Sequence, residues 1–347
     1  MATMKAAFFD GESSMVLADV KTPEPGPDDV IIRVRATGIC GSDLLMNVDK
    51  TEPDQIPFGH EVAGEIAEVG PGGDTSLVGR RVAIETIGHG LACATCWYCR
   101  QGQFRQCLNK RPNEGGGFAQ YMKRRAIGCY PLPDGMSWED GALVEPLAVS
   151  VHGVRRGQMQ GGETVAVLGS GNIGLTAIAA ARAMGAGKIF ATARHAQQAE
   201  MAKALGADEV VSSEGAELKE ALEAATEGRG ADVTIETVGG HNGATLEQSI
   251  DVTRMQGRIV ILGGFRRPIT MDLLPPLLKE QSVIFSSCYS IMNGQHDYEL
   301  AIDMLASGRT PLQQIVTHKY TLEEIEQGFA AAYDKTTGSI KVQIHQD

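Results

Sequence analysis

The sequence predicts an α/β plus β protein, in which a β-rich part drawn from both ends of the chain is joined to an inserted doubly wound parallel sheet. Three observations predict this class. The chain has 347 residues, which is enough for two domains that each bury a core. Glycine-punctuated β-branched segments dominate roughly the first 150 residues. From about residue 160 onward, expected strands alternate with expected helices.

The expected strands of the first part are short and half-buried. Residues 30–35 and 62–69 mix β-branched and polar side chains in rough alternation, which is typical of strands with one face in a core. Glycine and proline clusters mark the turns between strands, at 23–27, 70–73 and 114–117. We therefore expect the first part to be rich in β-strands.

The alternating part begins at residue 164. Strands are expected at 164–168, 188–192, 209–211, 233–236, 259–262 and 283–285. Helices are expected at 175–184, 196–205 and 216–225, and before each of the last two strands. Such alternation builds a parallel sheet that is covered on both faces.

The C-terminal tail carries helices near 298–306 and 322–336 and a closing strand at 339–344. The tail is too short to form a domain, so we expect it to fold back onto the first part. The predicted domains are therefore residues 1–150 together with 291–347, and an inserted domain at 151–290.

Composition excludes several classes of protein. Acidic side chains outnumber basic ones by 43 to 31, for a net charge of −12, and no basic stripe is visible, so nucleic acid is not an expected partner. The N-terminus lacks the apolar core of a signal peptide. The most apolar stretch, residues 175–186, is short and contains Arg182, so no membrane span is expected. Seven cysteines in such a chain indicate thiolates or metal ligands and a cytoplasmic protein.

A glycine-rich loop follows the first strand of the alternating part and opens a helix, which is the setting of a Rossmann dinucleotide site. The first glycine permits a tight turn, the second lets the backbone approach a pyrophosphate, and the third lets helix and strand pack closely. The helix N-terminus offers free N–H groups to the phosphates. An ordinary glycine-rich turn is the alternative. The expected cofactor contacts in this loop are Gly169, Gly171, Asn172, Ile173 and Gly174.

The end of the second strand of this part indicates the type of cofactor. Chains that bind NAD place an acidic residue there, which bonds to the adenosine 2′-hydroxyl. This sequence has Ala193 at about that place, followed by Arg194 and His195. Without the carboxylate a 2′-phosphate is not repelled, and a guanidinium can donate two hydrogen bonds to it. We therefore expect NADP in preference to NAD, unless Arg194 is only a solvated loop residue.

Four of the seven cysteines lie close together, at Cys93, Cys96, Cys99 and Cys107. Four thiolates on loops this short can form a tetrahedral Zn²⁺ site. Four protein ligands leave no open position, so such a site is structural rather than catalytic. Free thiols, an iron–sulfur cluster or two disulfides are the alternatives.

A second candidate metal site is dispersed over three segments, around Cys40, His60 and Glu145. One thiolate, one imidazole and one carboxylate suit a catalytic zinc that keeps a fourth position open. Taken one at a time, each segment has an ordinary structural explanation. Asp43 could be a turn residue, His60 a loop histidine and Glu145 a helix cap.

These motifs occur in the order seen in the zinc-dependent medium-chain alcohol dehydrogenases, which the chain resembles over nearly its whole length. The shared segments are Gly-Ile-Cys-Gly-Ser-Asp at 38–43, Gly-His-Glu-x-x-Gly at 59–64, the four-cysteine lobe, Glu-Pro-Leu-Ala at 145–148, the nucleotide loop and the closing segment at 338–342. The resemblance implies a GroES-like β-barrel catalytic domain with an inserted Rossmann domain. Glu145, where other members carry a cysteine, is similar to the polyol, threonine and secondary-alcohol branches.

The resemblance also implies roles for individual residues. Glu61 looks like a carboxylate that either neighbours the metal or serves as an alternate ligand. Asp43 resembles the group that orients His60, and Ser42 resembles the first hydroxyl of a proton relay. The implied ligands of the catalytic zinc are Cys40, His60 and Glu145. With the four-cysteine lobe, this implies two zinc ions per chain.

Two positions depart from the pattern of the relatives. Many relatives carry a histidine where this chain has Leu45, so the proton is expected to leave through Ser42, water and the cofactor ribose, or by another path. Polyol dehydrogenases usually place a substrate-binding arginine where this chain has Ser286. Apolar residues near the expected pocket also favour a less polar alcohol over a polyol, unless they belong to the core; they are Leu44, Leu45, Met46 and Phe58.

We therefore expect an enzyme that transfers a hydride between an alcohol and NADP(H), giving an aldehyde or ketone, with a secondary, aliphatic or aromatic alcohol as substrate. The first alternative is an NAD-dependent polyol or hydroxy-amino-acid dehydrogenase of the same family. A zinc-free reductase of activated double bonds and a non-enzymatic scaffold that binds zinc and nucleotide are two others. The family resemblance implies a homodimer or a homotetramer.

Overall fold

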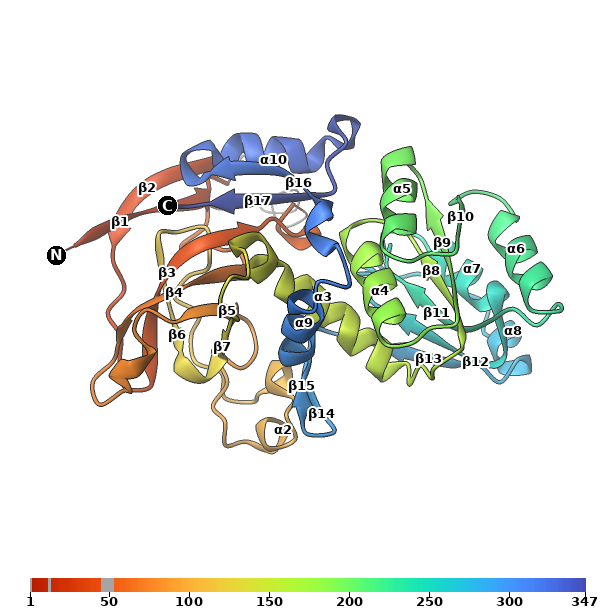
Figure 1. The fold of residues 1–347 in the computed structure, drawn as a ribbon, viewed down its shortest axis with the longest axis horizontal. Coiled ribbons are helices and arrows are strands. Elements are labelled where there is room, and N and C mark those ends of the chain that lie inside the picture. The colour runs from red at the N-terminus through yellow and green to blue at the C-terminus, as the bar shows by residue number, and fades with distance from the viewer. Residues whose placement is uncertain (1, 12–13, 45–52) are drawn as a thin grey trace. The chain divides into compact units, whose positions relative to one another are not determined.

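The computed structural model describes residues 2–11, 14–44 and 53–347. The chain divides into two compact units, whose elements are labelled in Figure 1. The first unit contains Met1–Glu145, Tyr289–Ala306 and Val316–Asp347, and the second contains Pro146–Cys288 and Ser307–Ile315. Residues 307–315 thus belong to the inserted unit, whereas the sequence analysis placed them in the tail of the first.

The second unit is built on a sheet of six strands whose neighbours are all parallel. The strands are β8 (Thr164–Leu168), β9 (Lys188–Ala193), β10 (Glu209–Ser212), β11 (Ala231–Glu236), β12 (Thr253–Ile261) and β13 (Ser282–Phe285). Their order is β10-β9-β8-β11-β12-β13, so the chain runs outward from β8 and then returns to β11 beside it. This reversal confirms the predicted doubly wound sheet.

Helices connect these strands and cover the sheet. They are α4 (Asn172–Ala183), α5 (Ala196–Ala204), α6 (Glu217–Ala225), α7 (Ala244–Val252) and α8 (Leu274–Leu278). Since parallel crossovers are right-handed, the reversal at β8 puts α4 and α5 on one face and α6 and α7 on the other. The apolar face of α6 packs Leu218 and Leu222 against Phe190, and α7 packs Leu246 against Ile259.

The first unit contains a seven-stranded sheet assembled from both ends of the chain. Its strands are β3 (Asp29–Gly38), β4 (Glu61–Val69), β5 (Arg81–Glu85), β6 (Tyr121–Arg125), β7 (Cys129–Pro131), β16 (Val316–Thr321) and β17 (Lys341–His345). The order is β16-β17-β3-β4-β5-β7, with β6 paired to β3. The C-terminal strand β17 runs antiparallel to β3, with Gln343 opposite Gly38, so the tail folds back as the sequence predicted.

Smaller elements complete this unit. They are strands β1 (Thr3–Phe9), β2 (Met15–Lys21), β14 (Ile291–Met292) and β15 (Gln295–His296), and helices α2 (Trp97–Arg100), α9 (Asp297–Ala306) and α10 (Ile325–Tyr333). Turns of 3₁₀ helix lie at Thr75–Leu77, Phe104–Gln106, Ala126–Gly128, Leu312–Ile315, Leu322–Glu324 and Lys335–Thr337, the fourth of them in the second unit.

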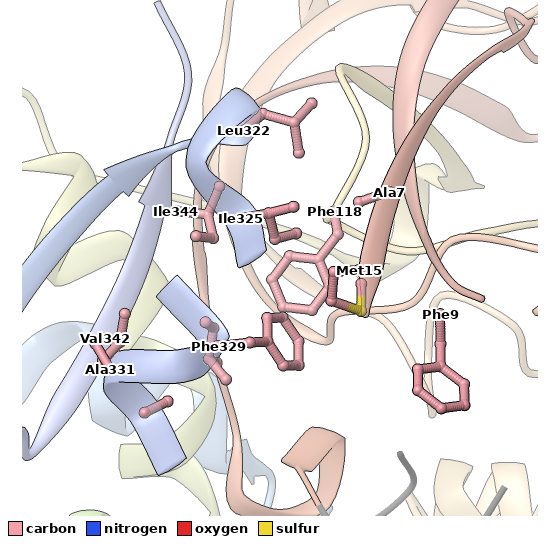
Figure 2. Packing of buried hydrophobic residues seen from close by; sticks show 12 residues of the cluster. Ala7, Phe9, Met15, Phe118, Leu322, Ile325, Phe329, Ala331, Val342 and Ile344 are labelled. Carbon is pink, nitrogen blue, oxygen red and sulfur yellow. The ribbon is translucent and has the colours of Figure 1, made fainter. Parts of the chain in front are cut away.

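One hydrophobic core of the first unit lies between β17, α10 and the N-terminal strands (Figure 2). The ring of Phe118 meets that of Phe329 edge to face, with 5.6 Å between ring centroids. Ile39 belongs to this core and is only 5% exposed. Because Ile39 immediately precedes Cys40, the core fixes the backbone at the first predicted metal ligand.

One long helix, α3 (Trp138–Arg156), was not predicted from the sequence. Pro146 lies inside it and has no N–H to donate to the preceding turn, which is the feature that argues against a helix in the sequence. Glu145 therefore lies within a helix rather than capping one. None of the described helices is long and apolar enough to cross a membrane.

Candidate metal centres and nucleotide site

Two of the predicted metal ligands, Cys40 and His60, are joined by one buried carboxylate. The backbone N–H of Cys40 donates to Asp43 Oδ2 at 2.9 Å. The other carboxylate oxygen, Asp43 Oδ1, lies 3.4 Å from His60 Nδ1, and the Asp43 side chain is only 2% exposed. Asp43 therefore occupies Nδ1 of the ring and leaves Nε2 of His60 for a metal, which is how metal-binding histidines are usually oriented.

The charges around His60 favour a cation at this position. Burial opposes protonation of the ring, but Asp43 and the Cys40 thiolate raise the pKa of His60 well above its usual range. A metal ion at Nε2 would replace the proton, because ligands bind metals in their deprotonated form. The surrounding anions would stabilise either cation.

Glu61, at the start of β4, is fully buried and paired with a residue that the sequence analysis did not assign. Lys341 Nζ on β17 donates to Glu61 Oε1 at 2.7 Å and Oε2 at 2.5 Å, and to the carbonyl of Ile39 at 3.0 Å. A Cβ on Gly38 would lie 1.9 Å from Glu61 Oε2, so only glycine leaves room for this carboxylate. In the sequence, a lysine within the apolar closing strand was the one feature that indicated a buried ion pair.

The described structure brings ligand-type atoms of Cys40, His60 and Glu61 within 4.8 Å of one another. Glu145 is not a member of that group, although it is near enough to be affected by it. Burial raises the pKa of Glu145 to about 7, while His60 lowers it and Glu61 raises it further. The ligand role of Glu145 stays a prediction, with Glu61 as the alternate. Thiolate, imidazole and carboxylate are all ligands that Zn²⁺ takes.

The apolar residues expected to line a substrate pocket divide into two groups. Leu44 and Phe58 pack against the core of Figure 2, so they carry no information about the polarity of a substrate. Leu45 and Met46 lie outside the described residues. Ser286, just after β13, has a buried hydroxyl with no hydrogen-bond partner among the described residues. Of the features that favour a less polar alcohol over a polyol, only Ser286 in place of an arginine remains.

The four clustered cysteines converge as a metal site requires. Cys96 Sγ lies 3.5 Å from Cys99 Sγ and 4.0 Å from Cys107 Sγ, and Cys93 Sγ lies 3.9 Å from Cys99 Sγ. Four sulfurs at about 2.3 Å from one zinc stand at such separations. All four cysteines are free thiols, so no disulfide joins them.

Backbone N–H groups point at these sulfurs and favour the thiolate. Hydrogen bonds from Thr95 and Cys96 lower the pKa of Cys93 to about 5. Burial raises the pKa of Cys99 to about 12, so this thiol would release its proton only to a metal. The donor set and its spacing fit a closed structural zinc site.

A third group of ligand-type side chains, Glu85, His89 and His296, is buried in the same unit. The N–H of Tyr298 donates to His296 Nδ1 at 3.1 Å, so the neutral ring carries its proton on Nε2, which lies 3.0 Å from Glu85 Oε2. A protonated nitrogen has no lone pair for a metal. We therefore describe this group as a polar network around Glu85 rather than as a metal site.

The nucleotide loop of the second unit has the form that the motif predicts. Gly169 has φ +90°, and a Cβ on Gly174 would lie 1.8 Å from the Gly169 carbonyl oxygen, so both positions require glycine. A Cβ on Gly171 would meet nothing within 4 Å, which leaves the backbone approachable. Asn172 is the first residue of α4, so its backbone N–H has no acceptor within the helix. These features fit a phosphate group at the N-terminus of α4.

The end of β9 is anchored to this loop. Thr192 Oγ1 accepts the N–H of Gly169 at 2.8 Å, and its carbonyl accepts the Ser170 hydroxyl at 2.9 Å. Ala193 ends the strand, Arg194 is exposed, and His195 precedes α5 without capping it through its side chain. Arg194 is thus an exposed residue that directly follows the strand anchored to the loop.

Comparisons with known proteins agree with this architecture. The family model "Alcohol dehydrogenase GroES-like domain" matches residues 26–134, and the model "Zinc-binding dehydrogenase" matches residues 172–307. A sorbitol dehydrogenase of Bacillus subtilis is 33% identical over 351 residues, which covers 99% of this chain and 97% of the relative. An L-idonate 5-dehydrogenase of Vitis vinifera is 32% identical over 341 residues, with 93% and 90% covered.

A solved structure also matches the whole chain. It is a zinc-binding dehydrogenase from Sinorhizobium meliloti bound to NADP, with a TM-score of 0.84, 27% identity and complete coverage of both chains. Fold and site together define a zinc-dependent oxidoreductase that acts on alcohols. The chain belongs to the zinc-dependent medium-chain alcohol dehydrogenase family, within its polyol branch.

Proposed function

We propose that the protein is an NADP-preferring dehydrogenase with two zinc ions per chain, one held at Cys40 and His60 and one held by the four-cysteine lobe. The observation that carries this proposal is the buried Asp43 carboxylate, which orients both His60 and the backbone of Cys40. Ligands fixed in this way are what a catalytic metal with an open position requires.

Zinc would activate the alcohol hydroxyl as a Lewis acid, and the nicotinamide would accept the hydride. Oxidation of CH–OH to C=O moves one hydride to NADP⁺ and releases one proton. Ser42 is half-buried and lies beside Asp43, and its hydroxyl would relay that proton by accepting it while passing its own proton on toward solvent. The Asp43 carboxylate keeps the His60 ring and the backbone at Cys40 in fixed positions.

The zinc assignment is tested with Cys40→Ser and His60→Ala. Both variants should lose one of two zinc ions and all turnover, and both should bind nucleotide as the wild type does, because the nucleotide loop is in the other unit. Normal turnover in either variant would refute the assignment.

The substrate is proposed to be a secondary alcohol, with aliphatic and aromatic alcohols first and polyols as the second candidate. Ser286 in place of an arginine supports the first group. The relatives named for sorbitol and L-idonate support the second, because both compounds carry several hydroxyl groups. Measuring kcat/KM over a panel of 2-alkanols, aromatic alcohols and polyols separates the two. A Ser286→Arg variant should raise the relative kcat/KM for polyols.

The preference for NADP is supported by the missing carboxylate at the end of β9 and by the exposed Arg194. Arg194→Ala should weaken NADP binding by about tenfold or more and leave NAD binding within twofold, since a charge-assisted bidentate contact contributes about 1.5–3 kcal/mol. Arg156→Ala, which removes another exposed guanidinium of the same unit, is the control. An equal loss of both cofactors would refute the preference.

A homodimer is supported by the exposed edge of the six-stranded sheet. Among the described strands β13 pairs with β12 alone, and Phe285 on it is 69% exposed. The same unit carries further exposed apolar side chains: Met255, Leu273, Leu274, Leu277 and Leu278. Exposed apolar side chains favour an interaction site where they gather, and an unpaired edge strand can pair with its own copy. Phe285→Glu with Leu277→Glu should convert a dimer into a monomer in sedimentation equilibrium, and a persisting tetramer would show that another surface assembles the protein.

The proposed compartment is the cytoplasm. A reducing environment would keep the seven free thiols available, four of them for the zinc lobe. Expression of the chain fused to a fluorescent protein and fractionation of the cells test this directly.

A further inference from the structure

We propose that Arg124 is a positioning residue for the metal centre at His60. It lies on β6, outside every motif that the sequence analysis used, and its side chain is only 3% exposed. The inference rests on the proposed function, since it assumes that a metal binds at Cys40 and His60.

The guanidinium of Arg124 is buried without an acidic partner among the described residues. Its guanidinium donates to neutral acceptors: the carbonyls of Thr86, Lys123 and Gly115, at 3.0, 2.7 and 2.7 Å, and Oδ1 of Asn113 at 3.0 Å. Burial lowers the pKa of Arg124 to about 10. A cation that is buried at this cost and bonded only to backbone and amide oxygens acts as a clamp between segments rather than as an ion-pair partner.

The first segment that the clamp holds leads directly to His60. Arg124 Nε donates to the carbonyl of Thr86, which follows β5. The Thr86 hydroxyl in turn donates to the carbonyl of His60 at 3.2 Å. Thr86 is 1% exposed, so water does not compete for either bond.

The second segment reaches the same histidine from its other side. Arg124 Nη2 bonds to both Asn113 and Gly115. The chain continues to Gly117 and Phe118, whose N–H groups donate to the carbonyls of Gly59 and Phe58 at 2.9 Å each. A Cβ on Gly116 would lie 2.5 Å from the carbonyl oxygen of Gly59, so the two segments are in close contact. One guanidinium therefore fixes the backbone before and at His60 through two separate segments.

The neighbouring arginine supplies a matched control. Arg125 lies on the same strand, but its side chain points to the other face, because side chains alternate along a strand. Arg125 Nη1 donates to the carbonyl of Ala92 at 2.5 Å, next to Cys93. It thus contacts the four-cysteine lobe and leaves the His60 segment untouched.

The test measures zinc at each centre in the full-length protein. Arg124→Lys keeps the positive charge but loses the planar guanidinium, which donates to several acceptors at once. It should therefore raise the zinc dissociation constant of the His60 centre about tenfold or more, as expected for loss of a group that orients a ligand. Arg125→Lys should leave that constant within twofold. In a Cys40→Ser background, which retains only the lobe zinc, Arg124→Lys should cause no further loss of zinc.

Two further measurements separate positioning from a general loss of stability. With Co²⁺ in place of zinc, the visible absorption bands of the His60 centre should change in Arg124→Lys, whereas those of the four-thiolate centre should not. Thr86→Val should shift the same bands in a protein that folds normally, and Thr86→Ser, which restores the hydroxyl, should reverse the shift.

Unchanged zinc affinity and unchanged spectra in both Arg124→Lys and Thr86→Val would refute the inference and leave the proposed function standing. Equal weakening of both metal centres in Arg124→Lys, with no effect of Thr86→Val, would also refute it, because this pattern indicates general destabilisation. If the wild type binds only the lobe zinc, the proposed function and this inference both fall.

Discussion

Lys341 and Glu61 form a pair in which each residue depends on the other. Both side chains are almost fully buried, at 1% and 0% exposure, and Lys341 directs its protons at Glu61 and at the carbonyl of Ile39. Removing one partner of a buried pair leaves an uncompensated charge in the core. The pair is also adjacent to Cys40, so its integrity bears on the metal centre.

We expect Lys341→Met to lower the free energy of unfolding by about 3–5 kcal/mol, because Glu61 would be left buried without a cation. The double variant Glu61→Gln/Lys341→Met should recover most of this loss. Lys319→Met is the matched control, since Lys319 pairs with Glu139 at 49% and 26% exposure and such pairs contribute about 0–1 kcal/mol. Urea unfolding followed by circular dichroism gives all three values. Equal losses in the two single variants would contradict the prediction.

At the scale of elements, the sequence predicted those parts whose pattern is local. The inserted sheet could be predicted because each strand is a short apolar run that a helix follows directly along the chain, as α4 follows β8. Helix α3 could not be predicted, because Pro146 is a residue that usually ends a helix. Burial in the folded protein maintains the helix in spite of it. Likewise, nothing near Arg124 in sequence indicates its role, because its partners at Thr86 and Asn113 come from other segments.

In the candidate site, too, local groups of residues were predictable from the sequence and groups drawn from distant segments were not. The cysteine lobe and the nucleotide loop were predicted from spacing, since their residues lie within one loop. The grouping of Cys40, His60 and Glu61 required family resemblance, because the residues meet only through the pairing of β3 with β4 and with β17. Lys341 arrives from the far end of the chain, and no local pattern connects it to Glu61.

The loop after β5 carries a buried histidine that should make the first unit sensitive to acid. His89 stacks on Phe104 with 3.8 Å between ring centroids, and its Nδ1 lies 2.9 Å from the hydroxyl of Tyr130. Burial lowers the pKa of His89 from 6.5 to about 4, with Glu85 opposing the shift. In the unfolded chain the ring takes up a proton below about pH 6.5, but in the folded protein it does so only near pH 4, so stability falls as the pH drops through this window.

For His89 this amounts to about 2 kcal/mol of stability lost between pH 7 and pH 5. His89→Gln, which can still bond to Tyr130, should therefore lose less stability than the wild type over the same range. His318→Gln, which removes a half-buried histidine on β16, is the control and should follow the wild type. Urea midpoints measured at both pH values test this. A pH dependence in His89→Gln as steep as in the wild type would exclude His89 as the cause.

At the scale of the whole molecule, every predicted metal ligand lies in the first unit, and the nucleotide loop lies in the second. Each unit also has hydrophobic cores of its own, as the clusters around Phe329 and around Leu168 show. Metal removal should therefore act on one unit alone. Binding to the folded state stabilises only the part of the protein whose folding creates the site.

We expect treatment with 1,10-phenanthroline to accelerate amide hydrogen exchange in residues 93–107 and around His60, and to leave exchange in β8, β9 and β11 unchanged. NADPH should then still slow exchange at the N-terminus of α4, because the loop at Gly169–Gly174 has no metal ligand. Hydrogen exchange with mass spectrometry resolves these segments in a single experiment. If chelation instead accelerated exchange throughout the parallel sheet, the two units would be one cooperative structure, and zinc would stabilise the nucleotide site as well as its own.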